Sequence, residues 1–500
     1  MKGKVYLIGA GPGDYELLTL KGLNCIRKAD IVVYDRLAND SFLKETKAGC
    51  EFIYVGKESK NHTKTQDEIN EIIAEEALEG KTVARLKGGD PYVFGRGGEE
   101  GEFLLEKGVD FEVVPGITSA IGGLCYAGIP ITHRDYASSF HVITGHLKEE
   151  DKELNWEALA KLDGTLVFLM GMANLQNICN NLIEQGKCKD TPVAIINWAT
   201  RPEQKVVTAT LETIYEVVQR EGIKPPSLIV VGGVVALRDK LNFFEKKPLF
   251  GKNIVVTRAR TQSSKLVEEL KSLGADVVEF PTIKIKEIIP NEQLDNSIRC
   301  LKEYSYVVFT SINGVNIFFK RLMNLGFDSR VFGGTKIVAI GSSTAKELTK
   351  YGLIADIVPD KFVAEELFKE LENVITKEDK VLIPRASEAR EILVEKLSKL
   401  CFVKEVKIYD TVAGEGKREK IIELLKDGKI DYITFTSSST VKNLVKILGE
   451  KNLSLLDGVK LMSIGPITSK TIEEFGLKVY REAEEYTISG LVHSLLACQY

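Results

Sequence analysis

Short apolar segments of this 500-residue chain end repeatedly in turns that contain glycine. Residues 82–84 have strand character and lead into the richest such turn, 85–100 (RLKGGDPYVFGRGGEE), with five glycines among charged side chains. Glycine permits positive φ angles and a close approach of backbone to ligand. Ligands of open α/β sheets collect at the carboxyl ends of strands, so this pattern predicts an α/β fold with a binding loop here. A solvated surface turn is the alternative.

Length, charge and cysteine spacing restrict the class of protein. A chain of 500 residues predicts two to four domains. The net charge of -4 and the pI near 6.0 argue against general binding to nucleic acid or to an anionic membrane. The eight cysteines form no C-x-x-C pair and accompany five histidines, so neither a metal site nor a disulfide framework is expected. Without a signal-like or membrane-spanning apolar segment, the chain is predicted to be cytoplasmic.

The turn at 9–14 (GAGPGD) raises a dinucleotide-binding hypothesis and then weakens it. It follows a strand at 5–8 and precedes a helix at 19–29 and a second strand that ends on Asp35, as in dinucleotide folds. The dinucleotide-binding fingerprint has a third glycine at the position that Asp14 occupies here. Pro12 also lacks a backbone N–H that could bind a pyrophosphate. A ligand without phosphates is favoured, and an NAD-dependent oxidoreductase is the rival.

The same alternation of strands, glycine-containing turns and helices continues along the first half. A helix is expected over 66–79, and a strand at 111–114 leads into the turn 115–120. From about Thr118 the pattern restarts, which predicts a second α/β domain facing the first. Its expected strands are 140–144, 165–169, 192–196, 205–210 and 227–231.

Six motifs, in order, carry a family resemblance. They are GAGPGD (9–14), VYDR (33–36), RLKGGDPYVFGRGGEE (85–100), VPGITSA (114–120), PITHR (130–134) and FLMG (168–171). Together they resemble the S-adenosyl-L-methionine-dependent uroporphyrinogen-III C-methyltransferases, which belong to the tetrapyrrole methylases. The resemblance covers 1–243 and implies a two-domain fold, with sub-domains of about 1–117 and 118–243. It also implies S-adenosyl-L-homocysteine as a product and no metal.

The resemblance also implies residue roles. Asp35 and Lys57 match the acid/base pair, while Arg96, Glu99 and Arg134 match positions that contact the porphyrinogen. Arg96 is a further base candidate, but its guanidinium is a poor proton acceptor, so binding is the role expected. The residues that would hold the cofactor are Pro12, Gly88, Gly89, Asp90, Val93, Thr118, Ser119, Met170 and Ala199. Without the resemblance, Asp35 would be interpreted as a turn former and Met170 as core filling.

The second half follows a linker at 244–250 and contains an internal repeat. Residues 306–311 (YVVFTS) are echoed by 432–437 (YITFTS), and 338–341 (VAIG) by 462–465 (MSIG). A third pair is VVTR at 255–258 and LIPR at 382–385. The near-constant displacement between partners predicts two similar α/β lobes.

This half, 251–500, resembles uroporphyrinogen-III synthase. The resemblance implies a bilobal, doubly wound fold, with one lobe from 251–283 plus 413–500 and the other from 286–408. Tyr409 is the candidate to assist departure of hydroxide. The candidate substrate-binding residues are Arg258, Thr310, Ser311, Thr344, Ser437, Ser438 and Thr468. Each of these hydroxyl-bearing turns equally suits an ordinary helix cap.

Together the two resemblances predict a bifunctional enzyme. It would cyclise hydroxymethylbilane to uroporphyrinogen III with inversion of ring D, and methylate that product at C-2 and C-7 to precorrin-2. The alternative is a methyltransferase with a non-catalytic tetrapyrrole-binding module. A homodimer through the first half is expected, with no nucleic-acid or membrane partner. Separate dehydrogenase and chelatase enzymes would complete a sirohaem or cobalamin pathway.

Overall fold

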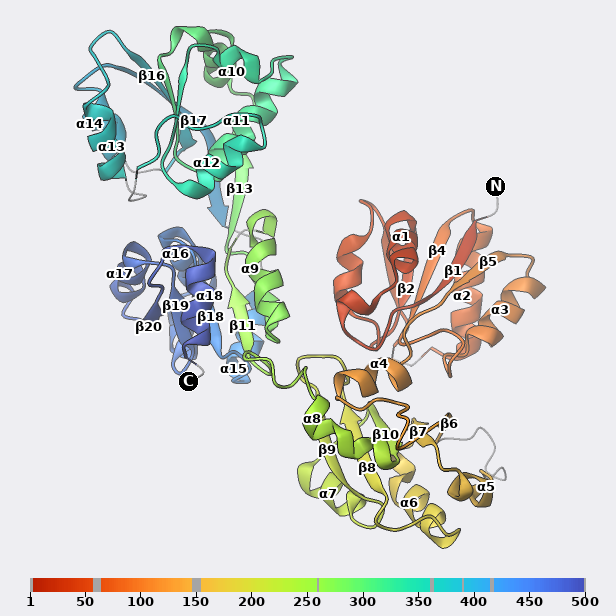
Figure 1. Cartoon of the computed structure of the whole chain (residues 1–500). Coiled ribbons are helices and arrows are strands. Elements are labelled where there is room, and N and C mark those ends of the chain that lie inside the picture. Colours follow the sequence, from red (N-terminus) through yellow and green to blue (C-terminus); the bar gives the residue numbers. More distant parts are fainter. Residues whose placement is uncertain are drawn as a thin grey trace. The chain divides into compact units, whose positions relative to one another are not determined.

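The computed structural model describes residues 3–56, 64–145, 154–258, 260–359, 364–388, 391–413 and 418–498. These residues build strands and helices in alternation, so the predicted α/β class is confirmed (Figure 1). They form two compact units: the chain up to Lys252 with Leu270–Asp276, and Asn253–Glu269 with Val277–Cys498. Within the described residues, no helix has the length and apolar character needed to cross a membrane.

The first sheet of the first unit is parallel, with strand order β3-β2-β4-β1-β5. Alternate side chains of β1 enter two different layers: Leu7 packs with Ile73 of α2, while Ile8 packs with Ile26 of α1. All five carboxyl ends therefore lie at one edge of a doubly wound layer. The elements are β1 Lys4–Gly9, η1 Tyr15–Leu17, α1 Leu20–Lys28, β2 Ile31–Tyr34, η2 Asp40–Glu45, β3 Glu51–Tyr54, α2 Gln66–Leu78, β4 Thr82–Lys87, α3 Gly97–Glu106 and β5 Asp110–Val114.

The second sheet of this unit is mixed, with order β6-β7-β10-β8-β9. Helix α4 follows β5 yet packs on this second sheet, where its Leu124 joins Val167 and Val230 in one apolar cluster. The first turn of α4 therefore stands between the two sheets. The elements are α4 Ser119–Tyr126, β6 Phe140–Thr144, α5 Trp156–Lys161, β7 Thr165–Leu169, η3 Met172–Asn174, α6 Leu175–Glu184, β8 Pro192–Asn197, β9 Lys205–Thr210, α7 Ile214–Glu221, β10 Ser227–Val231, η4 Gly233–Leu237 and α8 Arg238–Leu241.

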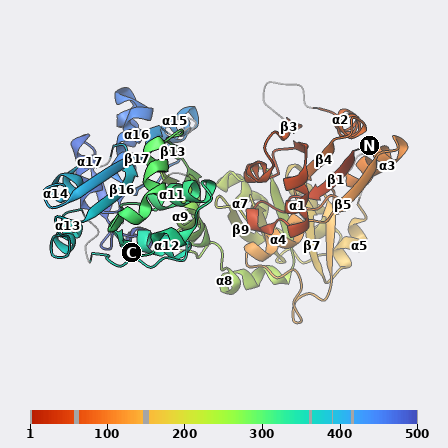
Figure 2. The ribbon, with the colours of Figure 1, turned by 90° about the horizontal axis from the view of Figure 1, so that it is seen from above.

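The second unit holds two further sheets, ordered β12-β11-β18-β19-β20 and β13-β17-β16-β14-β15. The long strand β17 pairs antiparallel with β13, and the two lie side by side in Figures 1 and 2. The strands are β11 Asn253–Val256, β12 Asp276–Glu279, β13 Ile283–Glu287, β14 Tyr306–Phe309, β15 Lys336–Ala339, β16 Lys380–Ala386, β17 Phe402–Ala413, β18 Tyr432–Phe435, β19 Lys460–Ser463 and β20 Val479–Glu482.

Helices flank both of these sheets. They are α9 Arg260–Ser272, α10 Glu292–Arg299, η5 Leu301–Glu303, α11 Ile312–Asn324, η6 Ser329–Phe332, α12 Ser342–Thr349, α13 Ala364–Glu372, α14 Ile392–Leu397, α15 Arg418–Lys426, α16 Ser438–Leu448, η7 Glu450–Leu456, α17 Pro466–Glu474 and α18 Ile488–Leu496.

The internal repeat corresponds to equivalent places in the two sheets of the second unit. In one sheet β11, β18 and β19 are consecutive neighbours, and in the other β16, β14 and β15 are. These are the strands that carry the three pairs of echoed segments. The echoed turns therefore occupy corresponding positions at the strand ends of two similar sheets.

Candidate functional site

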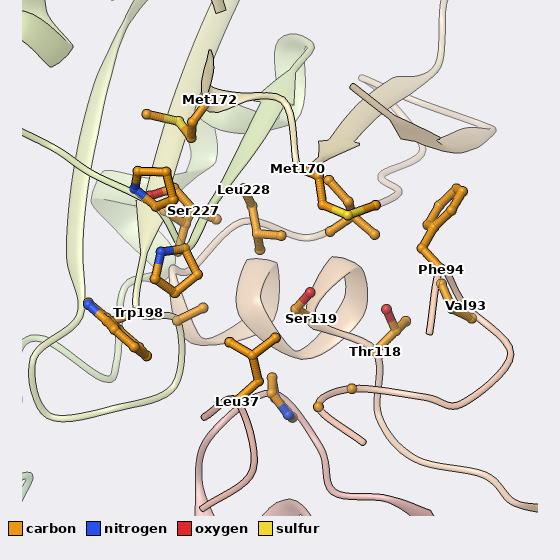
Figure 3. Close-up of a pocket in the computed structure, with 18 of the residues that line it drawn as sticks. Leu37, Val93, Phe94, Thr118, Ser119, Met170, Met172, Trp198, Ser227 and Leu228 are labelled. Carbon is orange, nitrogen blue, oxygen red and sulfur yellow. The ribbon is translucent and has the colours of Figure 1, made fainter. Parts of the chain in front are cut away.

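A cavity of about 440 Å³ opens inside the first unit, at the carboxyl edge of its first sheet. This volume is typical of a small-molecule site, for which about 300–1,000 Å³ is usual. The turns after β1 and β4 and the start of α4 form one side, and the ends of β7 and β8 form the other. Figure 3 shows Leu37, Met170 and Leu228 around the opening, with the hydroxyls of Thr118 and Ser119 at the start of α4.

The cavity collects most of the residues that the sequence predicts for a cofactor. Asp90 lies outside its lining and instead binds backbone: one carboxylate oxygen accepts from the N–H of Tyr92 at 2.8 Å and the other from Gly116 at 2.9 Å. The predicted residues that line the cavity are Pro12, Gly88, Gly89, Val93, Thr118, Ser119, Met170 and Ala199.

Four glycines let the strand ends meet beside the cavity, and two of them, Gly11 and Gly89, line it. A Cβ on Gly116 would lie 2.3 Å from the carbonyl oxygen of Gly89 and 2.6 Å from Cα of Gly9. Gly89 and Gly11 also exchange backbone hydrogen bonds of 2.7 and 3.2 Å. The neighbouring atoms belong to backbone, so no side-chain rotation can relieve a substitution here.

Unusual backbone conformations concentrate at this site. Phe94, Met170 and Trp198, with φ of 53°, 57° and 46°, all line the cavity. Arg96 at 57° and Thr200 at 68° are close by in sequence, and these five are the non-glycine residues with positive φ in the described chain. Such a conformation costs about 1–3 kcal/mol and persists only where the surroundings enforce it. Its clustering here marks a functional site.

Asp35 follows β2 at the same edge of the sheet. Its Oδ1 accepts a hydrogen bond from the N–H of Leu37 at 2.9 Å, and its Oδ2 lies 3.6 Å from Nη2 of Arg85. Arg85 is buried in β4, so a cation held by the core faces the carboxylate. The side chain of Asp35 is 26% exposed, which leaves it accessible to a ligand.

A fully buried carboxylate holds Arg85 in turn. Glu100 of α3 is 0% exposed, and its Oε1 lies 2.6 Å from Nζ of Lys87 and 3.3 Å from Nε of Arg85. The side-chain amide of Gln66 donates to the same oxygen at 3.1 Å, while Oε2 of Glu100 is buried without a hydrogen-bond partner. Burial, together with the charge of Arg85, lowers the pKa of Lys87.

The predicted macrocycle-contacting residues lie outside the cavity lining. Arg96 precedes α3 and forms a two-pronged ion pair with Glu99, with Nε at 2.9 Å from Oε1. This pairing raises the pKa of Arg96, so its guanidinium stays protonated. Arg134 is exposed, next to the bridge between His133 and Ala137. Lys57 lies outside the described residues.

The structure adds cavity residues that sequence reasoning missed. Arg201 lines the cavity, and its guanidinium carbon lies 4.8 Å from the ring centroid of Trp198; that of Arg36 lies at 5.3 Å. The expectation that ligands bind at the carboxyl ends of strands identifies the turn containing Trp198, but it does not give the orientation of the Trp198 ring. Pro226 and Ser227 had no comparable signal, because they lie at the start of a strand rather than at its end. The other missed lining residues include Leu37, Phe94, Met172 and Pro225.

In the second unit, the structure brings Tyr409 and Ser311 together. The phenol oxygen of Tyr409 lies 2.9 Å from Oγ of Ser311, which also caps α11 by accepting from the N–H of Gly314 at 3.0 Å. Tyr409 is 5% exposed, and burial raises its pKa despite hydrogen bonds to Ser311 and Asn313. The phenol therefore remains a proton donor at neutral pH.

The other candidates in this unit lie on separate turns. Thr344 and Thr468 are buried in the first turns of α12 and α17, and Thr310 is half-buried at the end of β14. Ser437 shares a hydrogen bond with Ser439, and the hydroxyl of Ser438 donates to the carbonyl of Ile467. Arg258 follows β11, and burial lowers its pKa.

Comparison with known proteins connects both units to tetrapyrrole chemistry. Residues 4–215 match the family model for Tetrapyrrole (Corrin/Porphyrin) Methylases, and 264–493 match that for Uroporphyrinogen-III synthase HemD. Porphyrin biosynthesis protein HemD of Ruminiclostridium josui is 43% identical over 99% of this chain and 98% of its own length. The chain belongs to this family, in which a tetrapyrrole methylase is fused to a uroporphyrinogen-III synthase.

Two further comparisons concern C-methyltransferases of the same class. A uroporphyrinogen-III C-methyltransferase of Bacillus subtilis is 44% identical over 72% of this chain and 74% of its own length. A crystal structure of uroporphyrin-III C-methyl transferase from Thermus thermophilus, complexed with S-adenyl homocysteine, is 39% identical; the match covers 47% of this chain and 100% of that one, with a TM-score of 0.41. The predicted fusion and the predicted bifunctional enzyme of porphyrin biosynthesis are confirmed by the family.

Proposed function

We propose that the methylase half transfers methyl groups from S-adenosyl-L-methionine to C-2 and C-7 of uroporphyrinogen III, forming precorrin-2. The synthase half supplies that substrate by closing hydroxymethylbilane with inversion of ring D. The meeting of eight predicted cofactor residues in one cavity carries the methylase assignment. We propose 1–243 for the methylase half, 244–250 for the linker and 251–500 for the synthase half, with lobes of 251–283 plus 413–500 and 286–408.

The cavity residues fit S-adenosyl-L-methionine, which when bound supplies an electrophilic methyl group. Gly88 and Gly89 allow close backbone approach, and Thr118 and Ser119 offer hydroxyls for its polar groups. The apolar side chains around Met170, which is 55% exposed, would exclude water from the reacting centre once cofactor and substrate cover them. Pro12, Val93 and Ala199 would contact the rest of the cofactor. Asp90 would act indirectly, because its hydrogen bonds to Tyr92 and Gly116 fix the backbone that follows β4.

For the methyl transfer, Asp35 is the proposed proton acceptor. The pyrrole loses an N–H proton as its ring carbon attacks, and a carboxylate positioned by Arg85 can receive it. Lys57 is the proposed partner in acid/base chemistry. Arg96 and Arg134, with Glu99 orienting Arg96, would bind acidic side chains of the macrocycle, because guanidinium groups clamp carboxylates bidentately.

In the synthase half, Tyr409 is proposed to donate a hydrogen bond to the departing hydroxide. Its raised pKa keeps the phenol protonated, and Ser311 orients it at 2.9 Å. Arg258 and the hydroxyl-bearing turns are proposed to position carboxylates of the linear substrate: Thr310, Ser311, Thr344, Ser437, Ser438 and Thr468. Folding the substrate into the ring-closing geometry would then be the main contribution.

Substituting Gly116 by alanine is expected to abolish measurable cofactor binding. The added Cβ would be forced against the backbones of Gly89 and Gly9, so the backbone beside the cavity must move. Titration calorimetry with S-adenosyl-L-homocysteine checks this, and Gly98→Ala serves as a control because Gly98 does not have a positive φ and a Cβ there meets nothing within 4 Å. Wild-type affinity in Gly116→Ala would contradict the packing described.

Substituting Tyr409 by phenylalanine is expected to slow formation of uroporphyrinogen III by about 10²-fold, the lower end of the range for one positioned proton donor. The ring stays in place, so packing is kept and only the hydroxyl is lost. The ratio of type III to type I isomer in the product measures this. Tyr306→Phe is the matched control, a buried tyrosine on β14 whose hydroxyl contacts the carbonyl of Val374.

A coupled assay tests both halves together. With hydroxymethylbilane alone the chain is expected to yield the type III isomer, and with S-adenosyl-L-methionine added, precorrin-2. Accumulation of only the spontaneously formed type I isomer would leave the C-terminal half as a non-catalytic binding module. Thermal stabilisation by NAD but not by S-adenosyl-L-homocysteine would overturn the methylase proposal.

The proposed partners follow from these activities. We propose a homodimer through the methylase half, which light scattering would test. Separate dehydrogenase and chelatase enzymes would consume precorrin-2 on the way to sirohaem or cobalamin.

A further inference from the structure

The segment that leaves the methylase half contains a carboxylate that is tied to its interior. Glu245 lies beyond α8, and beyond residue 215, where the methylase family match ends. One of its oxygens accepts from Nε2 of Gln204 at 2.8 Å, and the other forms an ion pair with Arg238 and accepts from the amide of Asn242 at 3.2 Å. Its side chain is 17% exposed. A mostly buried charge with this many donors has a fixed orientation.

From Gln204 the hydrogen bonds continue to the turn after β8. Oε1 of Gln204 accepts from the N–H of Thr200 at 2.8 Å, and Oγ1 of Thr200 accepts from the N–H of Asp14 at 2.9 Å. Gln204 and Thr200 are 5% and 2% exposed. The amide nitrogen of Gln204 donates to Glu245 and, at 3.3 Å, to the carbonyl of Tyr126. A side-chain amide has one donating end and one accepting end, so the carboxylate of Glu245, together with this carbonyl, keeps the accepting end of Gln204 facing Thr200.

The two turns joined in this way both contribute to the cavity wall. Ala199 and Arg201, which flank Thr200, line the cavity, and so does Pro12, two residues before Asp14. The turns are also in close contact, since a Cβ on Gly13 would lie 2.8 Å from Cγ of Arg201. Thr200 keeps its φ of 68° within this network, so releasing its N–H would free a strained turn to relax.

Tyr126 and the aromatic pair Phe243 and Phe244 pack beside the network. The hydroxyl of Tyr126 donates to Oδ2 of Asp14 at 2.8 Å, and burial and this contact raise its pKa. Its ring lies 4.7 Å from that of Phe244 and 5.7 Å from that of Phe243, centroid to centroid. Phe243 and Phe244, the two residues before Glu245, therefore pack against Tyr126, whose hydroxyl binds the turn that contains Asp14.

We propose that Glu245 is a positioning residue for the cofactor cavity. Acting through Gln204 and Thr200, it holds the Pro12 and Ala199 walls at the separation that binds S-adenosyl-L-methionine. The start of the connection to the synthase half is thus a working part of the methylase site. This inference rests on the proposed methyltransferase function.

The test uses the full chain and S-adenosyl-L-homocysteine in titration calorimetry. Glu245→Ala is expected to raise the dissociation constant about 5- to 30-fold, as for loss of one buried charged hydrogen bond. KM for S-adenosyl-L-methionine should rise in parallel, with kcat within about threefold of wild type. Gln204→Ala should have a similar effect, and the double variant should be little worse than either, because both interrupt one pathway.

An exchange of the two side chains makes the test directional. Gln204→Glu alone would place two carboxylates in contact and should weaken binding most. Combining it with Glu245→Gln restores a donor facing an acceptor, and the N–H of Thr200 keeps its acceptor. The carbonyl of Tyr126 loses its donor and Arg238 its charged partner, so affinity should recover by about fivefold or more relative to Gln204→Glu without reaching the wild-type value. A general loss of packing would not be rescued by this exchange.

Two controls separate a specific effect of Glu245 from a general loss of structure. Glu212→Ala removes an exposed carboxylate that pairs with Lys189, and it should leave affinity unchanged. Synthase activity of the same chain should stay constant in every variant. Unchanged affinity in Glu245→Ala, additive losses in the double variant, or no rescue by the exchange would overturn the inference. Failure of the wild-type chain to bind S-adenosyl-L-homocysteine would instead overturn the proposed function itself.

Discussion

Replacing Glu100 by alanine is expected to lower the free energy of unfolding of the methylase half by about 3–5 kcal/mol, the usual cost of breaking a buried ion pair on one side. Lys87 and Arg85 are 4% exposed and would lose the carboxylate at 2.6 and 3.3 Å. Lys87 could lose its proton, since burial has already lowered its pKa, but Arg85 would stay charged. Glu100→Gln keeps the shape and should cost less.

Urea unfolding followed by tryptophan fluorescence measures this effect selectively. The chain has two tryptophans, Trp156 and Trp198, and both lie in the methylase half. The midpoint should fall with the slope unchanged. Glu99→Ala, one residue away, is the matched control: its ion pair with Arg96 is about half exposed and should contribute about 1 kcal/mol or less. Equal midpoints for the two variants would show that the buried cluster does not stabilise the fold.

Glu100 illustrates what local sequence pattern reveals and what it leaves out. Arg85 and Lys87 are two residues apart on a strand, so the pattern places both on one face. Only the tertiary packing of α3 shows that this face is covered by Glu100. In the sequence, Glu99 and Glu100 are adjacent acids at the start of a helix. One forms an exposed ion pair and the other lies in the core.

The location of the cavity could be predicted from the sequence better than the strained backbone conformations of the residues that line it. Apolar runs followed by glycines identify strand ends, and strand ends of one sheet share an edge, so Gly88, Gly89 and Thr118 could be grouped from sequence. The left-handed conformations of Met170 and Trp198 could not, because neither residue prefers positive φ and only contacts distant in sequence enforce it. The role of Glu245 was hidden for the same reason, since its partner Gln204 lies 41 positions earlier.

Substituting Asp35 by asparagine is expected to reduce kcat for methylation by about 10²- to 10⁴-fold, the contribution of a positioned general base. The amide oxygen can still accept from the N–H of Leu37, so the turn should keep its shape. Asp35 does not line the cavity, so affinity for S-adenosyl-L-homocysteine should stay within about threefold of wild type. Single-turnover methylation and titration calorimetry separate the two quantities.

An aspartate at the opposite end of the same strand provides the control. Asp30 precedes β2, accepts from the N–H of Thr82 at 2.8 Å and pairs with Lys47, away from the catalytic edge. Asp30→Asn should leave kcat within about twofold of wild type. Arg96→Ala should behave like Asp35→Asn, but through binding of the acidic substrate, so its defect should shrink at saturating uroporphyrinogen III, whereas loss of a base should not. Equal losses of methylation and cofactor binding would remove Asp35 from the chemistry and leave it as a turn former.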